Sequence, residues 1–108
     1  MIELDSDAML PITPGLFAGD ALVLEEHQID QVILYDKECT PYIALETEDA
    51  PVWGFWSPPG KNAPFVCIEP WMGRCDVEGY EGDISGRDYI NKLEAGKSTA
   101  FTYRITVV

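Results

Sequence analysis

One carboxylate in this sequence follows directly on a stretch that should be buried. Glu69 comes after the apolar run Phe65 to Ile68 and before Trp71 and Arg74. A run that is apolar at every position is typical of a strand covered on both faces, so we expect the residue at its end to enter a partly dry environment. A carboxylate in such a place is costly unless it is paired or used. Glu69 is therefore the first candidate for catalysis or binding.

Metal and disulfide chemistry is not indicated elsewhere in the sequence. The cysteines Cys39, Cys67 and Cys75 form no C-x-x-C pair and are odd in number. The acidic run from Asp76 to Asp83 fails the register of an EF-hand loop, because it lacks the glycine at the sixth position and the terminal glutamate. We predict no metal and no cofactor, and unpaired cysteines fit a reducing, cytoplasmic location.

Length and charge restrict the class of protein. With 108 residues and 46% hydrophobic composition, we expect residues 1–108 to form a single globular domain. The formal net charge is −12, which argues against a nucleic acid or an anionic membrane as partner. The start of the chain has no signal-peptide pattern and no segment reaches the length of a membrane span.

The elements that must position Glu69 are predicted to be strands. Four segments of strand length are separated by polar, acidic or proline-containing connections, which predicts an antiparallel all-β fold: Ala21 to Glu25, Gln31 to Tyr35, Pro41 to Glu46 and Val52 to Trp56. The connection from Ser57 to Asn62 contains consecutive prolines and should be an exposed loop.

The two ends of the chain are less regular. Residues 9–20 predict a loop with one helical turn, and Met1 to Leu4 resembles the end of a strand. The glycine-rich run from Gly73 to Gly86 predicts a long irregular loop, followed by a short helix from Arg87 to Leu93. Residues 98–108 alternate apolar and polar side chains and predict a final strand.

Several motifs together resemble one family. The segment FVCIEPW-x-GR-x-D-x-x-x-Y-x-GD, the WSP loop before it and the upstream LPIT-x-x-LF-x-x-DAL are similar to the C-terminal portion of the aldose 1-epimerase (galactose mutarotase-like) family, in its LacX-like branch. The resemblance runs from about Leu10 to the last strand. It implies an antiparallel β-sandwich that is part of a supersandwich, with long loops and one or two helical turns. It also implies interconversion of the α and β anomers of a free aldohexose by a glutamate base and a histidine acid.

The resemblance assigns roles to five residues. Glu69 matches the family's catalytic base, and Asp20 in the DAL segment matches a ligand of the sugar hydroxyls. Trp56 and Trp71 would offer flat apolar surface to the C–H face of a neutral sugar. Arg74 would contact the substrate, or would instead pair with a loop carboxylate, Asp76 or Asp83, and hold the loop in place.

Each of these residues also has a plain structural interpretation. Glu69 would then be an ordinary acid at a strand end, and Asp20 a turn residue after Gly19. Cys67 lies two residues before Glu69 and shares its face of a regular strand, although a small buried side chain is its simpler role. Four other aromatic residues are expected in the core: Trp53, Phe55, Phe65 and Phe101.

One part of the family mechanism is missing from this sequence. Its only histidine, His27, lies in a polar connection and does not match the family's acid. We therefore expect a fragment that is inactive alone and lacks an N-terminal segment. The alternative is a carbohydrate-binding or self-associating β module without catalysis. The sheet edges and apolar faces exposed in such a fragment predict pairing with a second copy or with the missing segment.

Overall fold

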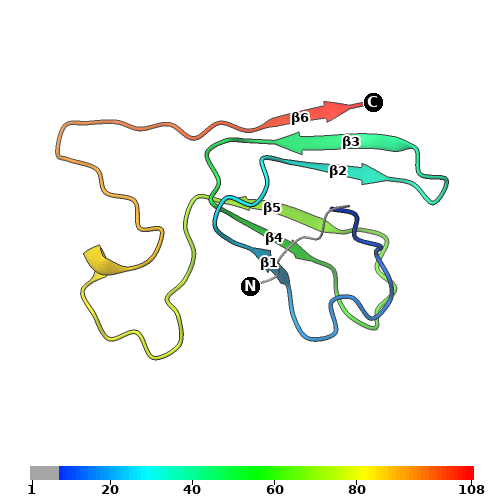
Figure 1. The fold of residues 1–108 in the computed structure, drawn as a ribbon, viewed down its shortest axis with the longest axis horizontal. Coiled ribbons are helices and arrows are strands. Elements are labelled where there is room, and N and C mark those ends of the chain that lie inside the picture. The colour runs from blue at the N-terminus through cyan, green and yellow to red at the C-terminus, as the bar shows by residue number, and fades with distance from the viewer. Residues whose placement is uncertain (1–7) are drawn as a thin grey trace.

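The structure is a computed structural model that describes residues 8–108, so the predicted strand end at Met1 to Leu4 lies outside the described residues. These residues form six strands and one short 3-10 helix (Figure 1): β1 (Leu22–Leu24), β2 (Gln31–Tyr35), β3 (Pro41–Glu46), β4 (Val52–Trp56), β5 (Cys67–Trp71), η1 (Ile84–Gly86) and β6 (Arg104–Val107). All strand pairs are antiparallel. The predicted all-β, antiparallel fold class is confirmed. No helix in the described part of the chain has the length and apolarity that a membrane span requires.

The strands build two three-stranded sheets, with the orders β1-β4-β5 and β2-β3-β6. β2, β3 and β4 have the predicted bounds, and β1 is one residue shorter at each end. The central strands β3 and β4 pair on both sides, so their backbone hydrogen bonds are satisfied and their bounds follow the apolar pattern closely. Within residues 8–108 the outer strands β1, β2, β5 and β6 each have one unpaired edge.

β5 differs from the predicted focal strand. The prediction placed the strand at Phe65 to Ile68 with Glu69 at its end, whereas β5 begins at Cys67 and continues to Trp71. Antiparallel pairing with β4 carries the ladder past Glu69, which lies opposite Gly54 in the middle of the strand. Pro70 is tolerated because β5 is an edge strand, where one missing N–H is not costly. The expectation of cover on both faces was wrong, since every residue of β5 is half-buried and Phe65 is exposed.

The small core lies where the two sheets overlap. Leu24 and Trp53 form its centre, and Val32 and Leu45 of the second sheet pack against them. The buried apolar side chains among residues 8–108 are Phe17, Leu24, Ala50, Val52 and Trp53. Trp53 is in the core as predicted and Phe55 packs against it, but Phe65 and Phe101 are exposed.

The first described segment, residues 8–21, adopts successive turns rather than one helical turn. Its backbone bonds run from Leu16 N–H to Thr13, from Ala18 N–H to Gly15 and from Asp20 N–H to Phe17. The loop at residues 57–62 is irregular, as predicted.

The connection from β5 to β6 is long and irregular, and Figure 1 shows it swinging away from both sheets before it returns. The predicted helix from Arg87 to Leu93 is absent, and the helical turn is η1 instead. Tyr89 has a φ of 58°, which a right-handed helix does not allow. β6 begins only at Arg104, because Thr102 donates its N–H to Asp49 rather than to a strand neighbour.

Candidate functional site

The alternation of side chains decides which residues share a face of the sheet β1-β4-β5. Trp53, Phe55 and Ile68 belong to the inner face, where they pack in or against the core. Their neighbours along β4 and β5 therefore point to the outer face. By register, the outer face of these two strands carries Val52, Gly54, Trp56, Cys67, Glu69 and Trp71, of which Val52 and Gly54 are buried and the other four are half-buried. The two predicted tryptophans and the predicted base thus share one surface.

Glu69 and Trp71 form the best-defined polar contact of this surface. Trp71 donates its indole N–H to Glu69, with 3.0 Å between Nε1 and Oε2. The indole lies flat against Gly54, the residue that pairs with Glu69 across the ladder. A methyl group built on Gly54 would come within 2.5 Å of Trp71 Cζ2. The Trp71 indole thus holds the Glu69 carboxylate by a hydrogen bond, and its ring packs on the backbone of Gly54, which has no side chain.

Trp56 and Cys67 extend this surface along the strands. They are directly paired, and both side chains are half-buried. Residues diagonal to one another on a sheet face are roughly 7–8 Å apart, so Trp56 is within side-chain reach of Glu69. The prediction that Cys67 shares the face of Glu69 agrees with the observed register.

Asp20 lies at the far corner of the same sheet. It is exposed, and its Oδ1 accepts the N–H of Ala21 at 2.7 Å. It lies two residues before β1, and β4 separates β1 from β5, the strand of Glu69. Its φ of 121° is rare for a residue with a side chain and holds the carboxylate in a sharp turn before β1.

Arg74 is engaged within the protein. Its Nε lies 2.5 Å from Glu25 Oε1, and its Nη2 lies 3.1 Å from Asp88 Oδ2. The guanidinium also stacks over Tyr89, with 5.0 Å to the ring centroid. Desolvation lowers the pKa of Arg74, but hydrogen bonds to Asp88 and Glu25 outweigh it and raise the pKa above its ordinary value.

These contacts make Arg74 the link between the long loop and the end of β1. The predicted loop partners Asp76 and Asp83 are not its partners: Asp76 pairs with Arg87 instead. Asp83 accepts bonds from Ser85 and caps η1. A substrate could reach the Arg74 guanidinium only by displacing one of its present partners.

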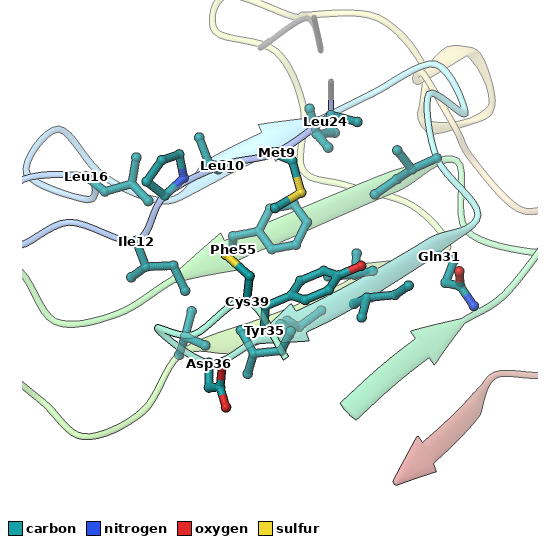
Figure 2. A pocket seen from close by; sticks show the side chains of 18 of the residues that line it. Met9, Leu10, Ile12, Leu16, Leu24, Gln31, Tyr35, Asp36, Cys39 and Phe55 are labelled. Atoms are coloured by element: carbon teal, nitrogen blue, oxygen red, sulfur yellow. The ribbon is translucent and has the colours of Figure 1, made fainter. Parts of the chain in front are cut away.

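One cavity lies away from these residues. It measures about 730 Å³ and is lined mainly by apolar side chains of residues 8–17, β2 and the inner face of the other sheet. Figure 2 shows Met9 and Ile12 on one side, Tyr35 and Cys39 across from them, and the Phe55 ring between. None of the five predicted site residues lines it. The lining is mostly apolar, and the carboxylate of Asp36 already accepts the N–H groups of Glu38 and Thr40. Such a space suits incomplete packing better than sugar binding.

A second, open groove of about 470 Å³ does include candidate residues. It runs along the free edge of β5, from Ile68 to Met72, below Leu45, Tyr103 and Ile105 of the second sheet. Glu69 and Trp71 border it through the strand edge, while their side chains belong to the outer face.

Gly54 is the site residue that was missed from the sequence. A single glycine inside the strand pattern VWGFW is a known signal of close approach, and here it makes room for the Trp71 indole. His27 is exposed in the turn after β1, where its backbone N–H bonds to Pro51. No group of three or more metal-ligating side chains gathers anywhere in residues 8–108.

Comparison with known proteins adds no relative: no protein-family model, no curated protein and no solved structure matches this chain. The fold and the site by themselves define a small antiparallel β-sandwich-like protein with a carboxylate–indole pair on the outer face of one sheet.

Proposed function

We propose that this chain corresponds to the C-terminal, base-bearing portion of an aldose 1-epimerase-like protein and that it binds a neutral aldohexose on the outer face of β4 and β5. The observation that carries the proposal is the Trp71–Glu69 hydrogen bond beside Gly54. It supports the motif-based role of Glu69 because it joins an ionisable acceptor to a flat apolar surface, the two features by which proteins hold neutral sugars.

The proposal gives each of the five residues a role. Glu69 accepts a hydrogen bond from a sugar hydroxyl with the carboxylate oxygen that Trp71 does not occupy. The rings of Trp71 and Trp56 contact the C–H faces of the sugar. Asp20, exposed in the turn before β1, accepts a hydrogen bond from a second sugar hydroxyl. Arg74 acts indirectly, by holding the loop after β5 against Glu25.

The chain alone is not expected to interconvert anomers. Anomerisation needs a base and an acid on opposite sides of one C–O bond, and loss of one of them removes roughly 10²–10⁴-fold of rate. The single histidine, His27, lies in a turn and donates only its backbone N–H in the contacts seen. Glu69 would therefore bind the sugar and could accept the proton of the anomeric hydroxyl, but no acid would protonate the ring oxygen.

Amide NMR tests binding directly. Glucose and galactose are titrated into the 15N-labelled chain while the indole N–H signal of Trp71 is followed. A saturable shift of this signal is expected, with weak affinity of about millimolar Kd, since few polar groups converge on the site. Glu69→Gln should weaken binding several-fold. Glu94→Gln, an exposed acid on the long connection, is the matched control and should bind like the wild type.

Polarimetry tests the catalytic part separately. Freshly dissolved α-glucose should mutarotate at the buffer rate in the presence of the chain. A rate that rises with protein and falls with Glu69→Gln would show that the chain has its own acid. Absence of any saturable NMR shift at high sugar concentration would refute sugar binding itself.

A further inference from the structure

The chain exposes more surface than a compact protein of its size. Its accessible surface is 8054 Å² for a mass of 12.0 kDa, where a compact monomer would expose about 6,000 Å². Crediting residues 1–7 with the full surface of an extended chain, about 1,200 Å², still leaves residues 8–108 with an excess of about 1,100 Å². The radius of gyration is 16.1 Å, against about 13 Å for a compact domain of this length. Part of the excess belongs to the long connection from β5 to β6.

The other part is an apolar sheet face that residues 8–108 leave partly uncovered. In the sheet β2-β3-β6, one face carries Val32, Leu34, Ile43, Leu45, Tyr103, Ile105 and Val107, as the register of the two ladders shows. Val32 and Leu45 reach the core. Towards β6 the cover ends: Tyr103 is 58% exposed, Ile105 56% and Val107 79%. We call the side chains of Leu45, Tyr103, Ile105 and Val107 the overhang.

The space below the overhang is bordered by a free strand edge. The two sheets are offset: β5, the last strand of its sheet, lies beneath the middle of the sheet β2-β3-β6. The groove of about 470 Å³ separates the free edge of β5 from Leu45, Tyr103 and Ile105. β6 ends the second sheet with its own free edge. Figure 1 shows that β5 and β6 run in opposite directions. The described part of each chain therefore offers two antiparallel strand edges without a partner strand, and one apolar face between them.

A second copy of the same chain can fill the space below the overhang. Rotation by 180° about an axis parallel to the strands inverts the second copy and places its overhang face to face with that of the first. The same rotation sets β6 of each copy beside β5 of the other, and because the axis preserves strand direction, the new pairs are antiparallel. Each three-stranded sheet of one copy then joins a three-stranded sheet of the other to form a six-stranded sheet, and each overhang is covered by the other.

We propose that the chain forms this two-fold symmetric dimer, with β5 of each copy paired to β6 of the other and the two overhangs packed face to face. A standard stable interface takes about 800 Å² from each partner, and the excess surface of about 1,100 Å², of which the long connection takes a share, is of this order. The residues of the overhang carry no charge, so the net charge of −12 does not have to be brought into the contact. Added salt should tighten the dimer by screening the remaining repulsion.

Sedimentation velocity of the full chain tests the dimer, which should have twice the mass of 12.0 kDa. Ile105→Lys places a charge in the overhang, where it would be buried in the dimer, and should raise the dissociation constant at least about 100-fold. Thr106→Lys is the matched control, because Thr106 is the next residue of β6 and points to the opposite face. It should remain dimeric.

Cysteine cross-linking tests the strand pairing, and it does not depend on how well Ile105→Lys folds. Cys67 lies on the outer face of β5. In the dimer this face continues onto β6 of the other copy, whose Arg104 and Thr106 point to the same side as Cys67. With Cys39 and Cys75 changed to serine, Arg104→Cys or Thr106→Cys should yield an oxidised dimer that is absent when Cys67 is also changed to serine.

Three outcomes would overturn the proposal. A wild-type chain that stays monomeric at high concentration excludes a second copy as the occupant, whether or not the monomer unfolds cooperatively. An open-ended series of larger oligomers contradicts the two-fold closure. A dimer that neither cysteine variant cross-links contradicts the pairing of β5 with β6. Glu69 and Trp71 point from the outer face and stay accessible in the dimer, so loss of sugar binding would not count against it.

Discussion

Replacing Gly54 by alanine tests whether the site depends on the close approach of Trp71. The new methyl group would lie 2.5 Å from Cζ2 and 2.8 Å from Cε2 of the indole, where carbon atoms normally keep about 3.5–4.0 Å. The indole must therefore shift by about 1 Å. Such a shift strains or breaks the 3.0 Å bond from Trp71 Nε1 to Glu69.

The expected cost combines three effects. Overpacking a fitted contact costs about 1–3 kcal/mol, and loss of one hydrogen bond costs about 0.5–1.5 kcal/mol. Alanine in place of glycine within a strand returns about 0.5–1 kcal/mol of conformational entropy. We expect Gly54→Ala to lower the free energy of unfolding by about 1–3 kcal/mol, which corresponds to roughly 4–20 °C in Tm for a chain of this length.

Thermal unfolding and the indole N–H signals of a 1H–15N spectrum measure the two consequences separately. Gly19→Ala is the control, because a methyl group there meets nothing within 4 Å. A double-mutant cycle with Trp71→Ala should show coupling: without the indole, Gly54→Ala should no longer destabilise. If Gly54→Ala unfolds like Gly19→Ala and leaves the Trp71 signal in place, the close approach inferred for this site is wrong.

Three further changes have defined outcomes. Thr47→Val removes the hydroxyl that donates to Thr102 O at 2.5 Å and should lower the free energy of unfolding by about 1–3 kcal/mol in urea titrations, whereas exposed Thr106→Val should not. Arg74→Gln should release the long loop and speed hydrogen exchange of the Glu26 N–H, which bonds to Tyr89; unchanged exchange would show that Arg74 does not hold the loop. Hydrogen bonds from Ser85 lower the pKa of Asp83 below its ordinary value of 3.8, so the stabilisation by this acid is present above that value and is lost as the pH falls through the lowered one. Asp83→Asn should therefore be less stable than the wild type at neutral pH and equal to it in strong acid, and an equal difference at both pH values would contradict this assignment.

The sequence by itself determined the class of fold and most of the strands. The apolar runs of β2, β3 and β4 indicated their bounds directly, because polar, acidic or proline-containing connections end each run. The alternation in β6 also gave the correct facing of Ile105 and Val107, although not the start of the strand. The motif around Glu69 selected the residues that now share one outer face, Glu69, Trp56 and Trp71.

Only the tertiary structure decided how those residues are held. Gly54 is near the Trp71 indole because β4 pairs with β5, a contact between segments far apart in the chain. Arg74 finds Glu25 and Asp88 rather than the nearer Asp76, since the folding path of the loop sets which carboxylates it meets. Exposed apolar faces were expected from the sequence, but which strand carries one was not, because an apolar strand face has the same pattern whether or not a layer lies beneath it. Local patterns specify faces and turns, whereas partners across a fold are chosen by the packing of the whole chain.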